Sequence, residues 1–117
     1  MSEKLLNAIL IDSESQTVKE IKLDNSNYLN ISTALGCQYF AVVSLPNGDS
    51  LFVDDEGLLK NPEHFFLFPD YPYPLAGRGL ILGCDYESGD SIDCKYVLED
   101  FEHRIAYMNK DEVLAAF

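Results

Sequence analysis

The segment from Tyr71 to Gly79, YPYPLAGRG, has the residue types of a ligand-binding loop. Gly77 and Gly79 flank Arg78 and would let backbone N–H groups approach an anion closely. A guanidinium group binds phosphate through two parallel hydrogen bonds, and tyrosine rings such as those of Tyr71 and Tyr73 stack on nucleobases. These five residues are therefore a candidate site for a small molecule such as a signalling nucleotide. The alternative is a turn that leads into a strand, with Arg78 in solvent.

Carboxylates form a second candidate site. Seven acidic residues lie from Asp85 to Glu102, where Lys95 is the only Lys or Arg. A shorter acidic group lies near the middle of the chain, and Asp49 is a candidate to extend it. Such arrays can imitate the phosphates of a nucleic acid and occupy a basic groove, or they form a solvated charged face. The candidate partner-binding residues are Asp54, Asp55, Glu56, Asp85, Glu87, Asp90, Asp93, Glu99, Asp100 and Glu102.

The acidic groups lack the spacing of a calcium-binding loop. An EF-hand needs a glutamate at its twelfth position, whereas the twelfth residue from Asp54 is Phe65 and the twelfth from Asp85 is Tyr96. A solvated turn is therefore favoured over a weak calcium site of another type. We expect no metal ion and no cofactor.

Zinc binding and nucleophilic catalysis have no supporting motif. Zinc sites use paired Cys or His ligands at short spacing, and no such pair occurs among Cys37, His64, Cys84, Cys94 and His103. No nucleophile motif places a Ser or Cys beside a base, and the carboxylates lie in surface-like turns. The sequence therefore favours a binding protein over an enzyme.

Composition indicates a single globular domain spanning residues 1–117. Apolar residues make up 47% of the chain, and 20 acidic residues against 8 basic ones give a net charge of −12. This charge disfavours direct binding to nucleic acids and to anionic membranes, because both carry negative charge. It favours the basic surface of another protein, with solubility alone as the alternative. Homo-oligomer formation stays open.

The cysteines and the N-terminus both favour a cytoplasmic location in the host cell. Cys37, Cys84 and Cys94 are odd in number and show no paired spacing, which is typical of a reducing compartment. The apolar run near the N-terminus ends at Asp12 and is too short for a signal peptide or a spanning helix.

Hydrophobic patterns predict the elements that carry these residues. Apolar or alternating runs predict strands at 5–11 and 17–23, and a cap cluster followed by Tyr28, Ile31 and Leu35 predicts a helix near 26–35. The Asn-Gly pair between two β-rich runs, 38–45 and 50–54, predicts a hairpin.

The second half of the chain gives weaker signals. The prolines of 69–74 predict a loop, and the apolar run 79–83 predicts a central strand. Residues 64–68 suit a strand or a helical turn. Helical spacing predicts a helix near 95–102. Residues 103–108 either continue this helix or form a last strand, and we favour the strand, followed by a short helix that is capped by Asn109 or Asp111.

The pattern LPNGD…VDDEGLLK…NPEHFF…PLAGRGLILG resembles a family of small proteins of unknown function from phages, conjugative elements and Firmicute-type bacteria. The likeness covers residues 1–90 and is densest at 45–84. The resemblance implies an origin in a mobile element and an action on host machinery. It brings no catalytic residues.

Together these patterns predict an α+β domain with an antiparallel or mixed sheet of five to six strands and two to three short helices on one face. The predicted function is non-enzymatic antagonism of a host defence or nucleic-acid-binding protein through the carboxylates. The alternative is a small-molecule binder or sponge that uses the loop at 71–79. A third function, that of an ordinary housekeeping accessory domain, stays open.

Overall fold

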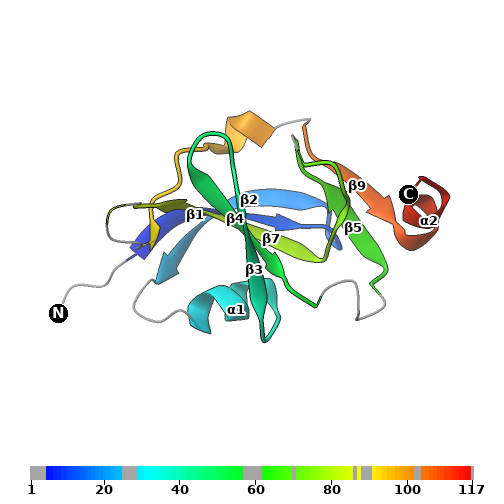
Figure 1. The fold of residues 1–117 in the computed structure, drawn as a ribbon, viewed down its shortest axis with the longest axis horizontal. Coiled ribbons are helices and arrows are strands. Elements are labelled where there is room, and N and C mark those ends of the chain that lie inside the picture. Colours follow the sequence, from blue (N-terminus) through cyan, green and yellow to red (C-terminus); the bar gives the residue numbers. More distant parts are fainter. Residues whose placement is uncertain are drawn as a thin grey trace.

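An antiparallel sheet of six strands forms the centre of the fold (Figure 1). The computed structural model describes residues 5–24, 29–56, 62–69, 71–85, 87, 91–101 and 104–116. The strand order is β2-β1-β7-β4-β3, and β8 pairs with the end of β7. The strands are β1 (Leu5–Asp12), β2 (Thr17–Asp24), β3 (Phe40–Ser44), β4 (Asp49–Asp54), β7 (Arg78–Cys84) and β8 (Ser91–Ile92). The predicted α+β class and the antiparallel sheet are confirmed.

The predicted hairpin joins β3 to β4. Gly48 has a φ of +94°, which a glycine adopts without strain, and the amide oxygen of Asn47 accepts the N–H of Asp49 at 2.9 Å. The N–H of Leu45 donates to the carbonyl of Asp49 at 2.9 Å and closes the turn. Local turn chemistry therefore accounts for this part of the sequence.

Each face of the sheet packs against a different partner. On one face, Leu80 and Leu82 of β7 join a core with the helix α1 (Leu29–Leu35), which contributes Ile31 and Leu35 as predicted. Tyr28, the first residue of the predicted helical stripe, lies outside the described residues.

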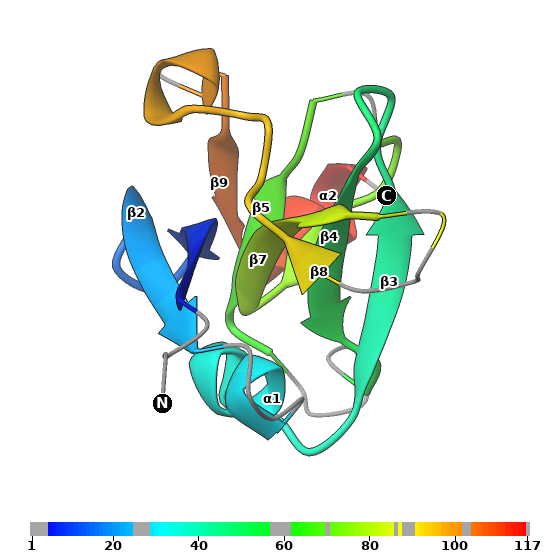
Figure 2. The same ribbon diagram turned by 90° about the vertical axis from the view of Figure 1, so that its left-hand side faces the viewer.

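The opposite face packs against a second, three-stranded sheet. Its order is β6-β5-β9, with β5 (His64–Leu67), β6 (Leu75–Ala76) and β9 (Ala106–Asn109). Phe66 of β5 and Ile81 of β7 are both fully buried in this core. Figure 2 shows β5 and β9 on the side of β7 away from α1.

The C-terminal region differs in detail from the prediction. The helix expected near 95–102 is a single 3-10 turn, η2 (Leu98–Phe101). The last strand is present as β9, and α2 (Lys110–Ala116) follows it. Asn109 caps α2 as predicted, because its side chain accepts the N–H of Glu112 while the Glu112 carboxylate accepts the N–H of Asn109. Within the described ranges, no helix is both long and apolar enough to cross a membrane.

Candidate functional site

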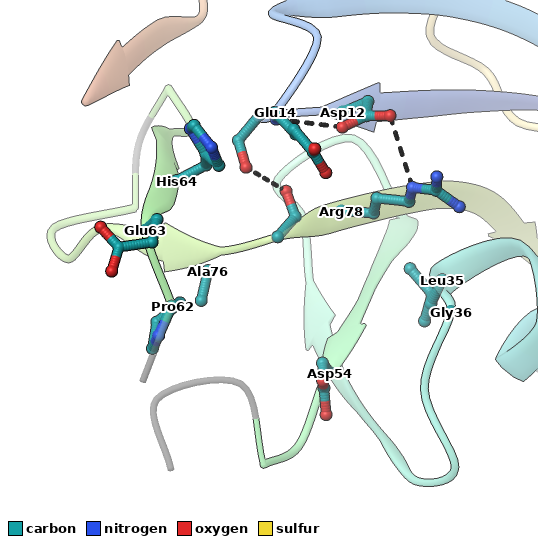
Figure 3. A pocket seen from close by; sticks show the side chains of 12 residues that line it. Asp12, Glu14, Leu35, Gly36, Asp54, Pro62, Glu63, His64, Ala76 and Arg78 are labelled. Atoms are coloured by element: carbon teal, nitrogen blue, oxygen red, sulfur yellow. Dashed lines mark hydrogen bonds and ion pairs between the residues drawn. The ribbon is translucent and has the colours of Figure 1, made fainter. Parts of the chain in front are cut away.

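A pocket of about 350 Å³ lies where β1 ends and β7 begins (Figure 3). The ends of β4 and α1 and the start of β5 complete its walls. Four carboxylates, a histidine and one arginine supply its charged and titratable groups. The lining residues are Asp12, Ser13, Glu14, Leu35, Gly36, Asp54, Pro62, Glu63, His64, Ala76, Gly77 and Arg78.

Arg78, the cation of the predicted binding loop, is part of this pocket and is already engaged. It lies directly opposite Asp12 in the β1–β7 ladder, and its Nε lies 3.4 Å from a carboxylate oxygen of Asp12. Its Nη1 donates to the carbonyl of Ala34 in α1 at 3.2 Å. The side chain is 43% exposed. Arg78 therefore links β1, β7 and α1, and its charge is partly neutralised before any ligand arrives.

The glycines on either side of Arg78 do not form the predicted anion cradle. Gly77 has a φ of +74°, but its N–H donates to the carbonyl of His64, and its own carbonyl accepts both the N–H and the hydroxyl of Ser13. Gly79 is buried within β7, where it pairs with β1 on one side and β4 on the other. The polar groups of Gly77 are committed to the fold and Gly79 is enclosed by the sheet, so neither is open to an anion.

The two tyrosines of the predicted site also lie apart from the pocket. Tyr71 packs against the core between the sheets, and Tyr73 is 64% exposed. Their rings contact each other edge to face, with centroids 6.4 Å apart. Of the five predicted ligand residues, the structure thus brings only Gly77 and Arg78 to the pocket.

The pocket instead gathers acidic residues, most of which the sequence prediction missed. Asp54 was predicted as a partner-binding residue, and it is joined here by Asp12, Glu14 and Glu63. Asp55 and Glu56 are exposed and follow Asp54 directly. We call these six residues the acidic end. Asp12, Asp54 and Glu63 lie far apart in the sequence, so no local pattern indicates that the fold places them around one pocket.

Asp85 and Asp93 of the second predicted acidic group lie at the opposite end of the sheet. The register pairs Val53, next to Asp54, with Gly79, whereas the other end of β4 pairs with Gly83, next to Cys84. The candidate surface is therefore two separate groups. The described residues of the second group are Asp85, Glu87, Asp93, Glu99 and Asp100; Asp90 and Glu102 lie outside the described residues.

Several carboxylates of this second group stabilise backbone turns. Asp85 accepts the N–H of Glu87 at 3.0 Å, and Asp100 accepts the N–H of Val97 at 2.8 Å. Asp93 accepts the N–H of Asn7 at 2.8 Å. These interactions give the carboxylates a role within the fold.

Asp49, which we expected on the acidic surface, is fully buried. Its carboxylate accepts the backbone N–H groups of Lys95 and Tyr96 at 2.9–3.0 Å and the side-chain amide of Asn47 at 3.1 Å. The prediction that Asp49 lies on the surface was wrong, because most of its hydrogen-bond donors lie in a segment that is distant in the sequence. Asp49 anchors that segment to the β3–β4 hairpin.

Cys94 lies next to the segment that Asp49 anchors and is itself partly buried. Desolvation, followed by the negative charge of Asp49, raises the pKa of the Cys94 thiol from its usual value of 9.0 to about 11. Because the thiolate is the reactive form, at about pH 8 Cys94 should react with iodoacetamide roughly 100-fold more slowly than an ordinary thiol. Site-resolved mass spectrometry measures this rate, and Asp49→Asn should increase it. A rate equal to that of free cysteine would contradict the environment described.

The described residues offer no ready metal site. They contain no group of three or more Cys, His, Asp or Glu side chains that could hold a metal ion. Cys37, Cys84 and Cys94 are free thiols.

Part of the chain is similar to two curated proteins. It is 30% identical over 79 residues to the uncharacterized protein y4iR of Sinorhizobium fredii (strain NBRC 101917 / NGR234), covering 67% of this chain and 49% of the relative. It is 34% identical over 62 residues to protein PsiB of Rhizobium leguminosarum bv. phaseoli, covering 53% and 46%. The chain thus spans about half the length of the curated relatives it matches. No solved structure matches it significantly.

The match to a family model is more extensive. Residues 6–106 match the domain of unknown function DUF3846, a range that runs from β1 to the start of β9 and includes the whole pocket. The resemblance to a family of unknown function is therefore confirmed, and this chain belongs to the DUF3846 family.

Proposed function

We propose that this protein is a non-enzymatic binding protein that holds a basic segment of another protein at its acidic end. The observation that carries the proposal is the charge balance of the pocket. Four carboxylates line it, and its one arginine already pairs with Asp12. A phosphate would meet net repulsion there, whereas a lysine or arginine side chain would meet attraction.

The partner class follows from the same charge. Proteins that bind nucleic acids carry basic surfaces, and a carboxylate array can compete for such a surface. Antagonism of a nucleic-acid-binding or host defence protein is the role that we propose for the acidic end. The mobile-element origin expected from the resemblance makes a host defence protein the first partner to test. No catalytic step is part of this proposal.

A lysine octapeptide provides a simple probe. We expect wild-type protein to bind it at low salt and to lose this binding as salt rises from about 0.1 M to about 1 M, because the Debye length falls from about 10 Å to about 3 Å. Neutralising two exposed residues of the acidic end, Asp55→Asn with Glu56→Gln, should weaken binding roughly twofold to thirtyfold, since exposed ion pairs contribute about 0.2–1 kcal/mol each. Isothermal titration calorimetry measures both effects.

The second acidic group provides a matched control. Glu87→Gln with Glu99→Gln removes the same number of charges outside the acidic end and should change the affinity less than twofold. Equal losses in both double variants would show that only the net charge matters. Thermal stabilisation by a nucleotide that Arg78→Ala abolishes would instead support the small-molecule alternative, for which the position of Arg78 in the pocket is the one favourable observation.

A further inference from the structure

The two edges of the larger sheet differ in chemistry. The strand order leaves β2 and β3 as the outer strands of the main path, and Figure 2 shows β3 with no strand beyond it. Edge strands expose backbone N–H and C=O groups that can pair with another chain, and proteins commonly protect them with charge or proline. β2 carries such protection in Lys19, Glu20 and Lys22. β3, with the sequence FAVVS, carries neither charge nor proline.

Hydrogen bonds flanking β3 show which of its backbone groups face outward. Tyr39 accepts the N–H of Asp55 at 3.1 Å, and the N–H of Leu45 donates to Asp49 at 2.9 Å, so both odd-numbered positions bond toward β4. In an antiparallel pair, alternate residues bond inward and the residues between them face away. The backbone groups of Phe40, Val42 and Ser44 therefore face outward.

The side chains along this edge suit an added strand. Val42 is 54% exposed and the adjacent Tyr39 is 57% exposed. β-branched and aromatic residues are the ones that pack well against a neighbouring strand. Among the residues that the structure describes, none pairs with the outer edge of β3.

We propose that the outer edge of β3 accepts an extended segment of a partner protein, and that this segment carries a basic residue near Phe40. This inference rests on the proposed function, because the acidic end supplies the charge complementarity. Phe40 pairs with Asp54, so an added strand would pass about two strand spacings, roughly 10 Å, from Asp54. A lysine or arginine at that end reaches toward Asp54, Asp55 and Glu56. Two copies of this chain, each with a charge of −12, would repel one another in the same arrangement.

Two peptides of equal charge and length separate strand addition from charge attraction. One has the sequence Lys-Val-Thr-Val-Thr-Val-Lys and favours an extended strand; the other, Lys-Gly-Ser-Gly-Ser-Gly-Lys, does not. We expect the first to bind at least fivefold more tightly in calorimetry. On binding, the amides of Phe40, Val42 and Ser44 should gain protection from hydrogen exchange.

Val42→Pro should remove the difference between the two peptides. Proline deletes an outward N–H at this position and so blocks strand addition without removing a bond to β4. Val42→Thr, which keeps the branched side chain and the N–H, should bind both peptides like the wild type. A circular dichroism spectrum and a melting temperature establish that each variant is folded.

The outcomes separate this inference from the proposed function. Equal binding of both peptides, unchanged by Val42→Pro, would overturn strand addition and leave the acidic end as the binding site. Preferential binding of the first peptide that is insensitive to salt and to Asp55→Asn with Glu56→Gln would support the edge and overturn the charge-based function. Self-association in sedimentation that Val42→Pro abolishes would assign the edge to a second copy and overturn the choice of a partner protein. Failure of both peptides to bind would contradict both proposals.

Discussion

Replacement of Asp49 by alanine should lower the free energy of unfolding by about 3 kcal/mol. The carboxylate is fully buried and accepts the backbone N–H groups of Lys95 and Tyr96. Hydrogen bonds to a charged group contribute about 1.5–3 kcal/mol each to stability. Much of that contribution is lost when the donors have no acceptor. Alanine would remove the acceptor for both donors at once.

The physical effect extends beyond the hydrogen bonds themselves. Cys94, next to the anchored residues, donates its N–H to Asn7 of β1 at 3.1 Å, and Tyr96 packs against the buried ring of Phe101. The Asp49 carboxylate therefore connects the β3–β4 hairpin to the segment that leads to η2. Without it, we expect the amides of Lys95 and Tyr96 to lose protection from hydrogen exchange before the sheet unfolds.

Urea denaturation measures the predicted loss, with two variants for comparison. Asp49→Asn keeps one acceptor oxygen and the shape of the side chain, so its loss should be smaller than that of Asp49→Ala. Glu99→Ala removes an exposed carboxylate and should stay within about 0.5 kcal/mol of the wild type. A loss below about 0.5 kcal/mol for Asp49→Ala would show that the fold does not depend on this anchor.

Asp49 also shows which features of the fold can be predicted from local sequence and which cannot. Its neighbours Asn47 and Gly48 predicted the hairpin correctly, because turn chemistry acts over a few residues. The buried role of Asp49 depends on donors 46 and 47 residues later in the chain, and no local pattern indicates that pairing. An acidic residue in a turn therefore suggested a surface position.

The same distinction applies to the fold as a whole. The runs that form β1, β2, β4 and β7 were predictable because each is long enough to show apolar or alternating character. The second sheet was not predicted, because β6 has only two residues and β5 only four. A strand of that length gives too few positions for a periodic signal, and the pairing of β5 with β9 joins distant parts of the chain.

Three residues of the pocket were predicted as site residues: Asp54, Gly77 and Arg78. Arg78 was predicted as a ligand-binding residue because it is a lone basic residue between glycines, and the structure places it in the pocket. Its partner Asp12 lies on another strand, and only the register between β1 and β7 brings the two together. The acidic character of the pocket therefore depends on strand order, which the local patterns do not specify.

The packing around Gly79 explains why this position is a glycine, although the sequence pattern assigned it to a ligand site. A Cβ atom at this position would lie 2.8 Å from Cζ of Phe66 and 3.1 Å from Cδ1 of Leu51. Both side chains are fully buried, so neither has free space to move into. Gly79→Ala should therefore lower the free energy of unfolding by about 2 kcal/mol through overpacking.

Gly77→Ala provides the matched control two residues away. A Cβ atom there would have no neighbour within 4 Å, but φ is +74°, so the cost should be backbone strain of about 1 kcal/mol. Phe66→Leu in the Gly79→Ala background tests the cause directly, because it removes the ring atom that the new methyl group meets. The loss due to Phe66→Leu should be about 1 kcal/mol smaller in that background than in the wild type.

These variants distinguish packing from ligand binding without a known ligand. A packing role predicts that Gly79→Ala changes urea stability in purified protein and that Phe66→Leu partly compensates. A role in anion binding alone predicts wild-type stability for Gly79→Ala and no coupling to Phe66. Since Gly79 lies between β1 and β4 and touches the core that joins the two sheets, we expect the coupling. A measured coupling between Gly79→Ala and Phe66→Leu would show that Gly79 is needed for the close approach of the two sheets.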